Sequence, residues 1–410
     1  MVGLTTVYRV LCILFFCVTT SAYPSAGVQP NNLTSTSTVR EKRQLRHNVK
    51  GFYLWHRDLP IKYAFNNSVE KNVPFIKDLI NYMQERTCLN FEYDPQDFML
   101  MINGSDATKY CSSGMGRNTA FTNMNINITQ CLQHVGIGLM LHEFVHLFGA
   151  WHVFNEERSK EFISFTDEDK VIYKTVPNLR HLGLPFNLGS IVNYAPTSDS
   201  MPPMEQFASF YDAVPVFSDL RMINTIYKCP DLCDPEDLFR CSANLGLPNS
   251  RNCSTCLCPD GFEGPTCTDR TRSSYNNPPC GDTLYATDHS QTLHVAIEPS
   301  ASIVKNRDNA KEIMYPNICV WHIKAPLGKM VSLKVTGNTG YGPPHIRERH
   351  QLCYQKKVCS TYHVLASRYC INDDIERTPT LYSDGNLAVV IATSGWKYMK
   401  PLDVTYAAVD

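Results

Sequence analysis

The chain has 410 residues, of which 43% are hydrophobic, and its formal net charge is −1. This length exceeds one ordinary domain, and the hydrophobic content is sufficient for two or three packed cores. The balanced charge gives no reason to expect a nucleic-acid partner or a charged membrane surface as a binding site.

The first 22 residues, 1–22, predict a secretory signal peptide. Arg9 precedes an apolar run from Val10 to Val18, and small residues then lead to Ala22, where cleavage is expected. The apolar run is too short to cross a bilayer, and no later stretch reaches the ~18 apolar residues that a spanning helix needs. We therefore expect a secreted, extracellular protein with no transmembrane segment.

The cysteine content agrees with an oxidising compartment. Two of the 17 cysteines, Cys12 and Cys17, lie in the predicted signal peptide. The remaining 15 form an odd number, so one thiol is expected to be free or to pair with another chain, and the others to form disulfides. Five Asn-x-Ser/Thr sequons predict N-glycosylation, at Asn32, Asn66, Asn103, Asn127 and Asn252.

Residues 23–43 are polar and lack apolar periodicity, so they predict an unstructured pro-segment of a zymogen. The segment ends in Arg-Glu-Lys-Arg at positions 40–43, a dibasic stretch of the kind that secretory convertases cleave. The mature chain would then begin at Gln44. The alternative is that this stretch is only a solvated run of charges.

The patterning becomes globular after Gln44 and mixes helices with strands. Residues 61–65 alternate between apolar and polar positions, as in a half-buried strand, and residues 75–83 carry apolar side chains at helical spacing behind Pro74. A buried strand is expected at 98–102 and a second helix at 133–148. These elements predict an α+β domain that ends near Cys229.

The composition changes after that point. Residues 229–267 hold seven cysteines and little apolar sequence, so disulfides must hold this segment together. A polar linker follows at 269–279. From Cys280 to the end, short alternating runs at 331–335, 387–392 and 402–406 predict an antiparallel β-sandwich.

One stretch, His142-Glu-Phe-Val-His-Leu-Phe-Gly-Ala-Trp-His, carries the chemistry. His142 and His146 are four residues apart on a helix, so both imidazoles project from one face and can bind one zinc ion. Glycine at position 149 permits the left-handed turn that ends the helix, and His152 then supplies the third ligand. Glu143 points about 100° around the helix from His142 and flanks the metal.

Three protein ligands leave a fourth position for water, which is typical of a catalytic zinc site. Zinc would activate that water, and Glu143 would act as the general base that takes its proton. The alternative is a buried helix with unrelated histidines. Three histidines, a glutamate and a glycine at this fixed spacing arise by chance with a probability on the order of 10⁻⁴.

The extended motif resembles the metzincin metalloproteases, and its surroundings resemble the astacin family in particular. Residues 110–117 are similar to the astacin stretch that ends in Val-Gly-Arg, and Ser190-Ile-Val-Asn-Tyr194 is similar to the family's Ser-Ile-Met-His-Tyr turn. The resemblance implies a two-lobed zinc protease domain at 44–229. It also implies that residues 121–128 form a strand at the edge of the cleft, which could pair with an extended peptide; the alternative is a simple sheet edge. It makes Tyr194 the tyrosine that stabilises the transition-state oxyanion. It also implies the disulfides Cys88–Cys229 and Cys111–Cys131.

The resemblance continues beyond the protease domain. Residues 230–268 are similar to an EGF-like module, and residues 280–410 resemble a CUB domain through Cys280-Gly-Asp and Tyr315-Pro-Asn-Ile-Cys-Val-Trp321. This order of domains resembles that of the nematode astacins. The implied disulfides are Cys233–Cys253, Cys241–Cys256 and Cys258–Cys267 in the EGF-like module and Cys280–Cys319 in the CUB domain. The odd cysteine is expected among Cys353, Cys359 and Cys370.

Three departures from the astacin pattern concern the site and its activation. Val153 stands where the family has a glutamate that holds the processed N-terminus, and Val192 stands where it has the methionine beneath the metal. The pro-segment lacks the family's Phe-x-Gly-Asp latch. We expect a packing change at Val192, weaker zinc binding, and latency by another route.

These observations predict a secreted zinc metalloendopeptidase with one Zn²⁺ per chain, acting on extracellular proteins or peptides. The EGF-like and CUB modules would position the enzyme and could bind protein ligands. The alternative is an extracellular zinc-containing binding or matrix protein with impaired turnover, which the two valines favour. Glu143, Tyr194 and the three histidines favour the enzyme.

Overall fold

The structure is a computed structural model of the 410-residue chain. It divides into two compact units, Met1–Arg40 and Glu41–Asp410, and every described residue lies in the second unit. The described residues are 53–66, 73–104, 111–126, 138–162, 190–192, 217–272, 280–296, 317–338, 356–360, 366–367, 380–383, 385–394 and 402–410. The predicted signal peptide and pro-segment, and also Tyr194, Cys131, Cys353, Cys370, Asn32 and Asn127, lie outside these ranges. Of the predicted linker at 269–279, residues 273–279 lie outside them, and its predicted start is wrong because Asp269–Arg270 pair with Phe262–Glu263 as a strand.

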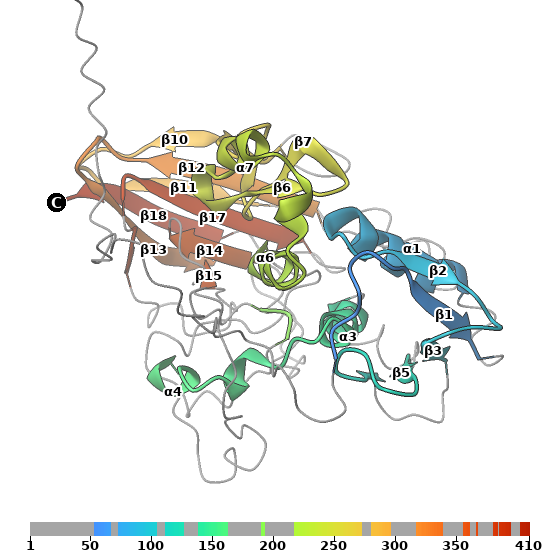
Figure 1. Cartoon of the computed structure of the whole chain (residues 1–410). Helices are drawn as coiled ribbons and strands as arrows, with labels where there is room; N and C mark the ends of the chain where they lie inside the picture. Colours follow the sequence, from blue (N-terminus) through green and yellow to red (C-terminus); the bar gives the residue numbers. More distant parts are fainter. Residues whose placement is uncertain are drawn as a thin grey trace, which may run out of the picture. The chain divides into compact units, whose positions relative to one another are not determined.

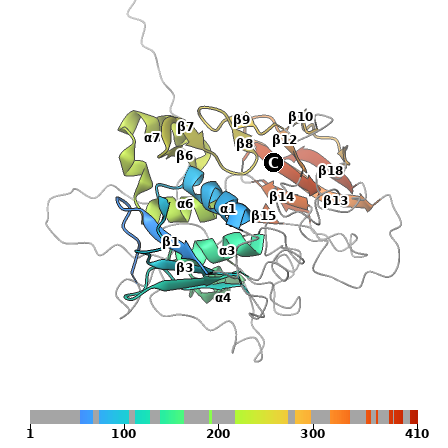
Figure 2. The same ribbon diagram turned by 90° about the vertical axis from the view of Figure 1, so that its right-hand side faces the viewer.

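The N-terminal part of the second unit contains a five-stranded sheet (Figures 1 and 2). Its strand order is β2-β1-β3-β5-β4, and all neighbours are parallel except β4 and β5. The sequence alternation over residues 61–65 appears as alternating burial on β1, and the predicted strand at 98–102 is β3, shifted by one or two residues. The bounds are β1 Ile61–Phe65, β2 Phe91–Tyr93, β3 Leu100–Asn103, β4 Ser112–Ser113 and β5 Thr122–Asn125.

The predicted edge strand at 121–128 is wrong in its position within the sheet. β5 lies between β3 and β4, and in the described residues the outer strand of this side is β4. The pairs Ser112–Asn125 and Ser113–Met124 occupy the edge of β5 that was expected to be open. Sequence periodicity could not show this, because β4 is too short for an alternating pattern.

Helix α1, Val73–Arg86, connects β1 to β2 and confirms the amphipathic helix predicted behind Pro74. Its apolar face is buried in the core of the domain, at Ile76, Leu79, Ile80 and Met83. The chain leaves the helix at Thr87, whose hydroxyl donates to the carbonyl oxygen of Met83 at 2.8 Å. The disulfide Cys88–Cys229 then ties the end of α1 to the chain that follows α6, Phe217–Ile226.

The zinc motif lies on helix α3, Gly138–Leu147, whose side chains belong to the same core. Residues 133–137 of the longer predicted helix lie outside the described part of the chain. After the helix come the short helices η2, Val153–Asn155, and α4, Ser159–Phe162. The turn Ser190–Val192 is also buried in this core.

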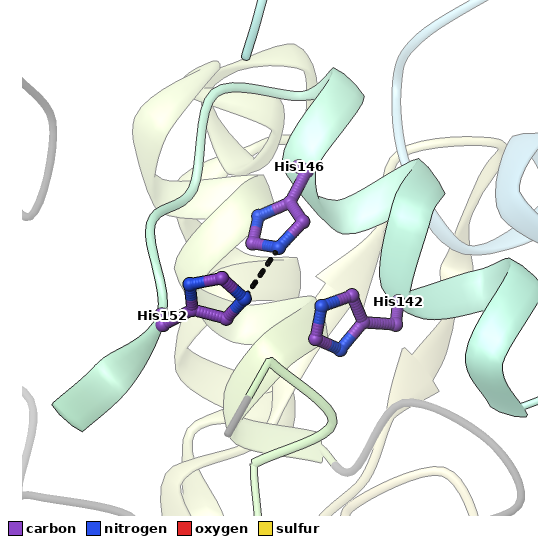
Figure 3. A group of neighbouring side chains, drawn as sticks. All are labelled: His142, His146 and His152. Atoms are coloured by element: carbon purple, nitrogen blue, oxygen red, sulfur yellow. Dashed lines mark hydrogen bonds between the residues drawn. The ribbon is translucent and has the colours of Figure 1, made fainter. Parts of the chain in front are cut away.

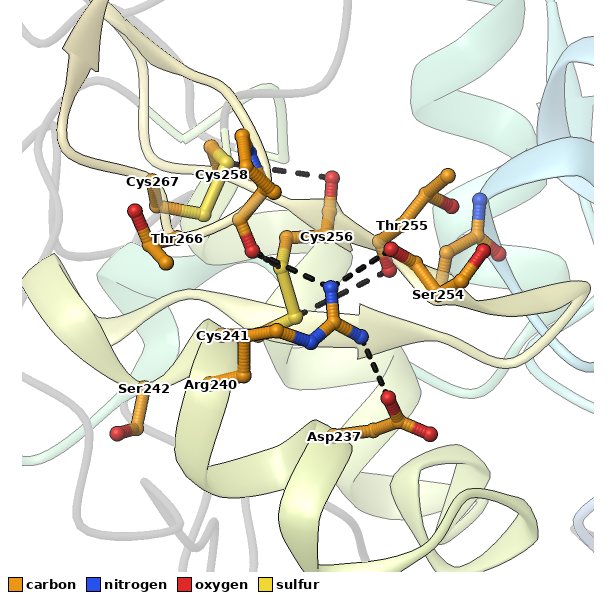
Figure 4. Close-up of a disulfide and its surroundings, with 12 residues drawn as sticks. Asp237, Arg240, Cys241, Ser242, Ser254, Thr255, Cys256, Cys258, Thr266 and Cys267 are labelled. Carbon is orange, nitrogen blue, oxygen red and sulfur yellow. Dashed lines mark hydrogen bonds and ion pairs between the residues drawn. A yellow bond between two sulfur atoms is a disulfide. The ribbon is translucent and has the colours of Figure 1, made fainter.

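Residues 229–270 form short elements held by three disulfides, Cys233–Cys253, Cys241–Cys256 and Cys258–Cys267. The guanidinium of Arg240 lies beside the Cys241–Cys256 disulfide and donates to the carbonyl oxygens of Cys253 and Ser254, both at 2.7 Å, and to Asp237 (Figure 4). The elements are η5 Cys229–Leu232, α7 Pro235–Cys241, η6 Ala243–Leu245, β6 Leu247–Asn249, β7 Asn252–Leu257, β8 Phe262–Glu263 and β9 Asp269–Arg270.

The C-terminal part is a β-sandwich of two sheets, with the orders β10-β12-β17-β14-β15 and β11-β18-β13-β16 (Figure 1). All described pairs are antiparallel except β10 with β12, so the predicted antiparallel sandwich is confirmed for most pairs. The two sheets share one core, and the disulfide Cys280–Cys319 links the start of the sandwich to it. The strands are β10 Thr283–Tyr285, β11 Gln291–Val295, β12 Asn317–Lys324, β13 Met330–Asn338, β14 Lys356–Ser360, β15 Ala366–Ser367, β16 Leu381–Tyr382, β17 Leu387–Ser394 and β18 Leu402–Val409.

Within the described residues, the helices are too short or too polar for any of them to cross a membrane.

Candidate metal centre

Three imidazoles meet where the C-terminal half of α3 faces the chain after Gly149 (Figure 3). His142 and His146 project from one face of α3, with ring centroids 4.5 Å apart, and His152 lies 4.5 Å from His146 and 5.3 Å from His142 by the same measure. One nitrogen from each ring lies within 4.8 Å of the others. The i, i+4 spacing and the return of the chain therefore converge as the motif predicts.

The return of the chain is produced by the end of the helix. Gly149 has φ of 94°, a conformation that L side chains rarely adopt. Its amide donates to the carbonyl oxygen of His146 at 2.8 Å, and the amide of Ala150 reaches back to that of Val145 at 3.3 Å, which is the Schellman pattern. This turn reverses the chain so that His152 faces the helix again.

Backbone carbonyls orient the two helical histidines. The Nδ1 atom of His142 lies 2.6 Å from the carbonyl oxygen of Ile191, and Nδ1 of His146 lies 2.6 Å from that of Ala150. A carbonyl oxygen only accepts, so both Nδ1 atoms must carry the hydrogen. Both Nε2 atoms then carry a lone pair, which is the form of imidazole that binds a metal.

The Nε2 atoms fit a metal ion. Each of the three rings places one nitrogen within 4.8 Å of the others, and Nε2 of His146 faces Nε2 of His152 at 3.1 Å. Because Nε2 of His146 accepts, the Nε2–H of His152 donates in this contact, and that hydrogen must move away when both nitrogens bind a metal. Nitrogens at about 2.0–2.1 Å from a tetrahedral zinc ion are separated by roughly 3.3 Å. The donor set and its spacing therefore suit zinc.

The environment keeps the three imidazoles neutral. Burial lowers the pKa of His146 to about 4 and that of His152 to about 3, the latter with help from the charge of His146. Burial also lowers the pKa of His142 well below 6.5, and the two other histidines add to this effect. At neutral pH all three side chains are therefore ready to bind a cation.

Glu143 follows His142 on α3, and its side chain is 5% exposed. Burial raises its pKa to about 7, although hydrogen bonds from Ser113 on β4 act in the opposite direction. The Ser113 hydroxyl also donates to the backbone carbonyl oxygen of Glu143 at 2.8 Å. A carboxylate with a pKa near neutrality can both accept and release a proton at physiological pH.

The sequence comparison identifies the domain that carries this site. Residues 48–228 match the model of the peptidase family Astacin. Residues 48–228 form an astacin domain. All three histidines and Glu143 lie within it, and the three histidines form its zinc-binding triad.

Curated relatives of this astacin domain include nematode zinc metalloproteinases. Zinc metalloproteinase nas-28 of Caenorhabditis elegans is 26% identical over 322 residues, which are 72% of this chain and 60% of that protein. Zinc metalloproteinase nas-27 of the same nematode is 24% identical over 396 residues, 86% of this chain and 84% of that protein. The chain thus spans 60% of nas-28, and it spans 57% of nas-29 from the same organism.

Solved structures similar to this chain include High choriolytic enzyme 1, a hatching enzyme zinc-protease from Oryzias latipes. It is 18% identical, with a TM-score of 0.34, and the match covers 43% of this chain and 94% of that one. The CUB1-EGF-CUB2 domains of rat MASP-1 match with 21% identity and a TM-score of 0.21, over 32% of this chain and 43% of that one. Both TM-scores are below 0.5, so the family assignment rests on sequence.

The astacin domain also contains contacts that the motif did not predict. The backbone carbonyls of Ile191 and Ala150 accept hydrogen bonds from the rings of His142 and His146. The hydroxyl of Ser113, outside the motif, donates to the backbone of Glu143. Backbone groups leave no signature in a sequence. Val153 and Val192 are both buried beside the site, and the amide of Val153 donates to the carbonyl oxygen of Val192 at 3.0 Å.

Proposed function

We propose that the protein is a secreted, zinc-dependent endopeptidase that hydrolyses peptide bonds of extracellular proteins. The observation that carries this proposal is the juxtaposition of three neutral imidazoles with one buried carboxylate, Glu143, whose pKa is raised to about 7. A purely structural zinc site is closed by four protein ligands and has no need of a proton acceptor.

The chain's own residues divide the chemistry between them. His142, His146 and His152 would hold zinc, which when bound polarises the scissile carbonyl and makes water a nucleophile near neutral pH. Glu143 would accept the proton from the attacking water and pass it to the leaving amine. Tyr194, from the astacin-like turn, would stabilise the oxyanion of the transition state.

The modules after the astacin domain support an extracellular role. The one–three, two–four and five–six pairing of Cys233–Cys253, Cys241–Cys256 and Cys258–Cys267 is that of an EGF-like module, which we assign to 230–268. The two-sheet sandwich with its Cys280–Cys319 disulfide supports a CUB domain at 280–410. Disulfides of this density form in secreted proteins. We propose that these modules bind protein ligands and position the enzyme.

Secretion and processing are part of the same proposal. Cleavage after residue 22 and again after Arg43 would release a mature chain that starts at Gln44. Among the described sequon residues, Asn66 and Asn252 are exposed, as glycosylation requires, and Asn103 is partly buried. N-terminal sequencing of secreted material tests both cleavages directly.

The test of activity uses the purified mature protein and a denatured protein substrate. Cleavage should stop when a chelator removes the metal and return when zinc is added. Glu143→Ala is the matched control, because it leaves all three ligands in place. If the wild type and Glu143→Ala are equally inert on a broad peptide library while both bind zinc, the peptidase proposal fails.

That outcome would support the second candidate, an extracellular zinc-containing binding or matrix protein. The observation that favours it is the pair of departures at Val153 and Val192, which lie beside the site and are 4% and 0% exposed. Val153 cannot hold a processed N-terminus by an ion pair, and Val192 replaces the methionine expected beneath the metal.

A further inference from the structure

We propose that Asp219 is a positioning residue of the zinc site. Its buried carboxylate fixes the Ser190–Val192 turn, and that turn holds His142 in the ring tautomer that can bind the metal. The inference deepens the proposed function, because it concerns how the same site is assembled.

The carboxylate of Asp219 is committed to the turn. Asp219 lies on α6 and is 3% exposed. One of its oxygens accepts the hydroxyl of Ser190 at 2.5 Å, and the other accepts the amide of Ile191 at 3.0 Å. Both carboxylate oxygens act as acceptors here, so the two donors of the turn are tied to α6.

The turn passes this restraint to the metal ligand. The carbonyl oxygen of Ile191 lies 2.6 Å from Nδ1 of His142, on the helix α3. A chain of contacts therefore runs from the carboxylate through the backbone of Ile191 to the imidazole. This restraint fixes the orientation of the His142 ring and leaves its Nε2 available to the metal.

The other polar groups of the turn are also used. The amide of Val192 donates to the hydroxyl of Ser190 at 3.3 Å, and its carbonyl oxygen accepts the amide of Val153, next to His152, at 3.0 Å. Every one of these contacts is made by the backbone or by Ser190. The buried side chain at position 192 takes no part in them, which explains how valine can stand there without breaking the link.

Two substitutions of Asp219 test the proposal. Asp219→Ala leaves the hydroxyl of Ser190 and the amide of Ile191 without their acceptor, so the turn is free to shift. Asp219→Asn keeps the size of the side chain but replaces one acceptor with a donor. Removing such an outer partner of a metal ligand lowers metal affinity by about 10–100-fold.

Asn224 provides the matched control on the same helix. It is 1% exposed, and its amide donates to the carbonyl oxygens of Arg86 and Leu220, both at 2.8 Å, neither of which belongs to the turn. Asn224→Ala should destabilise the domain yet leave the affinity for zinc unchanged. It therefore separates a loss of stability from a loss of positioning.

The measurements are the zinc dissociation constant, by competition with a chelating indicator, and the ring N–H signals of the histidines in ¹⁵N NMR of the metal-free protein. We expect Asp219→Ala to raise the dissociation constant about 10–100-fold and to weaken the protected Nδ1–H signal of His142. Asp219→Asn should show a smaller increase. If Asp219→Ala does not fold, the Asp219→Asn result decides the question.

An unchanged dissociation constant in the folded Asp219 variants would overturn the proposal. So would an equal increase in Asn224→Ala. Both readings are independent of proteolysis: a wild type that binds zinc and cleaves nothing refutes the endopeptidase and leaves the role of Asp219 intact.

Discussion

Replacement of both Cys88 and Cys229 by alanine should destabilise the astacin domain more than the loss of any shorter disulfide in the chain. This disulfide joins residues 141 positions apart, and both sulfurs are buried where α1 and the chain after α6 meet. Its removal frees the unfolded chain over almost the whole astacin domain, while the folded state loses only one cross-link.

The magnitude follows from the length of the closed loop. For the 141-residue separation, the chain-entropy relation gives about 5 kcal/mol at 25 °C. For the 39-residue separation of Cys280–Cys319 the same relation gives about 4 kcal/mol. Because whole domains are stable by only about 5–15 kcal/mol, the first loss brings the domain close to unfolding.

Hydrogen exchange followed by mass spectrometry can measure the effect element by element. In the Cys88→Ala/Cys229→Ala variant, protection of α1 should fall by about 10³-fold or more, since 1.4 kcal/mol corresponds to a factor of about ten. Protection of β12, in the sandwich, should stay unchanged. The matched variant Cys280→Ala/Cys319→Ala should show the reverse pattern. Protection of α1 that falls less than tenfold would refute the reasoning.

Four further predictions concern the site and its surroundings. Glu143→Ala should keep stoichiometric zinc in metal analysis but lose at least ~10²-fold in peptidase rate, and loss of the metal would contradict its role as a base. Gly149→Ala should lower the free energy of unfolding by at least about 1 kcal/mol, because φ of 94° is strained for alanine. It should also weaken zinc binding, because this turn carries His152 to the ion. A variant with the melting temperature and the zinc dissociation constant of the wild type would refute both expectations. Metal-free protein should lose stability as the pH falls from about 6.5 towards 4. In this range the unfolded chain takes up protons at His146 and His152, whereas the folded chain does not until the pH reaches their lowered pKa values of about 4 and 3. A free energy of unfolding that stays constant over this range, measured by denaturation, would refute the prediction. Arg251→Ala should increase hydrogen exchange at the end of α1, because the guanidinium of Arg251 donates to the carbonyl oxygens of Gln84 and Thr87 at 2.7 and 2.9 Å. Unchanged exchange at the end of α1 would show that these contacts are dispensable.

The sequence predicted those parts of the fold in which a local period dominates. The alternation at 61–65 and the helical spacing at 75–83 both became elements at those positions, because one face of each is buried in a single core. The metal ligands were predictable for the same reason: the helix period places His142 and His146 on one face, and one glycine allows the return of His152.

Contacts between distant segments were not predictable in this way. The carbonyl that orients His142 comes from Ile191, 49 residues further along, and the strand that covers β5 is only two residues long. Asp219 did leave a signal that sequence reasoning missed. It lies three, four and seven residues before Met222, Ile223 and Ile226, so it occupies an apolar face of α6, where a carboxylate needs buried donors.

The carbonyl contacts of the helical histidines have a consequence for the exchange of the ion. Since the carbonyl oxygens of Ile191 and Ala150 already hold the two rings by Nδ1 in the absence of a metal, capture of zinc requires little loss of side-chain freedom. Protein stripped by a chelator should accordingly reload at once on addition of zinc, without passing through an unfolded state.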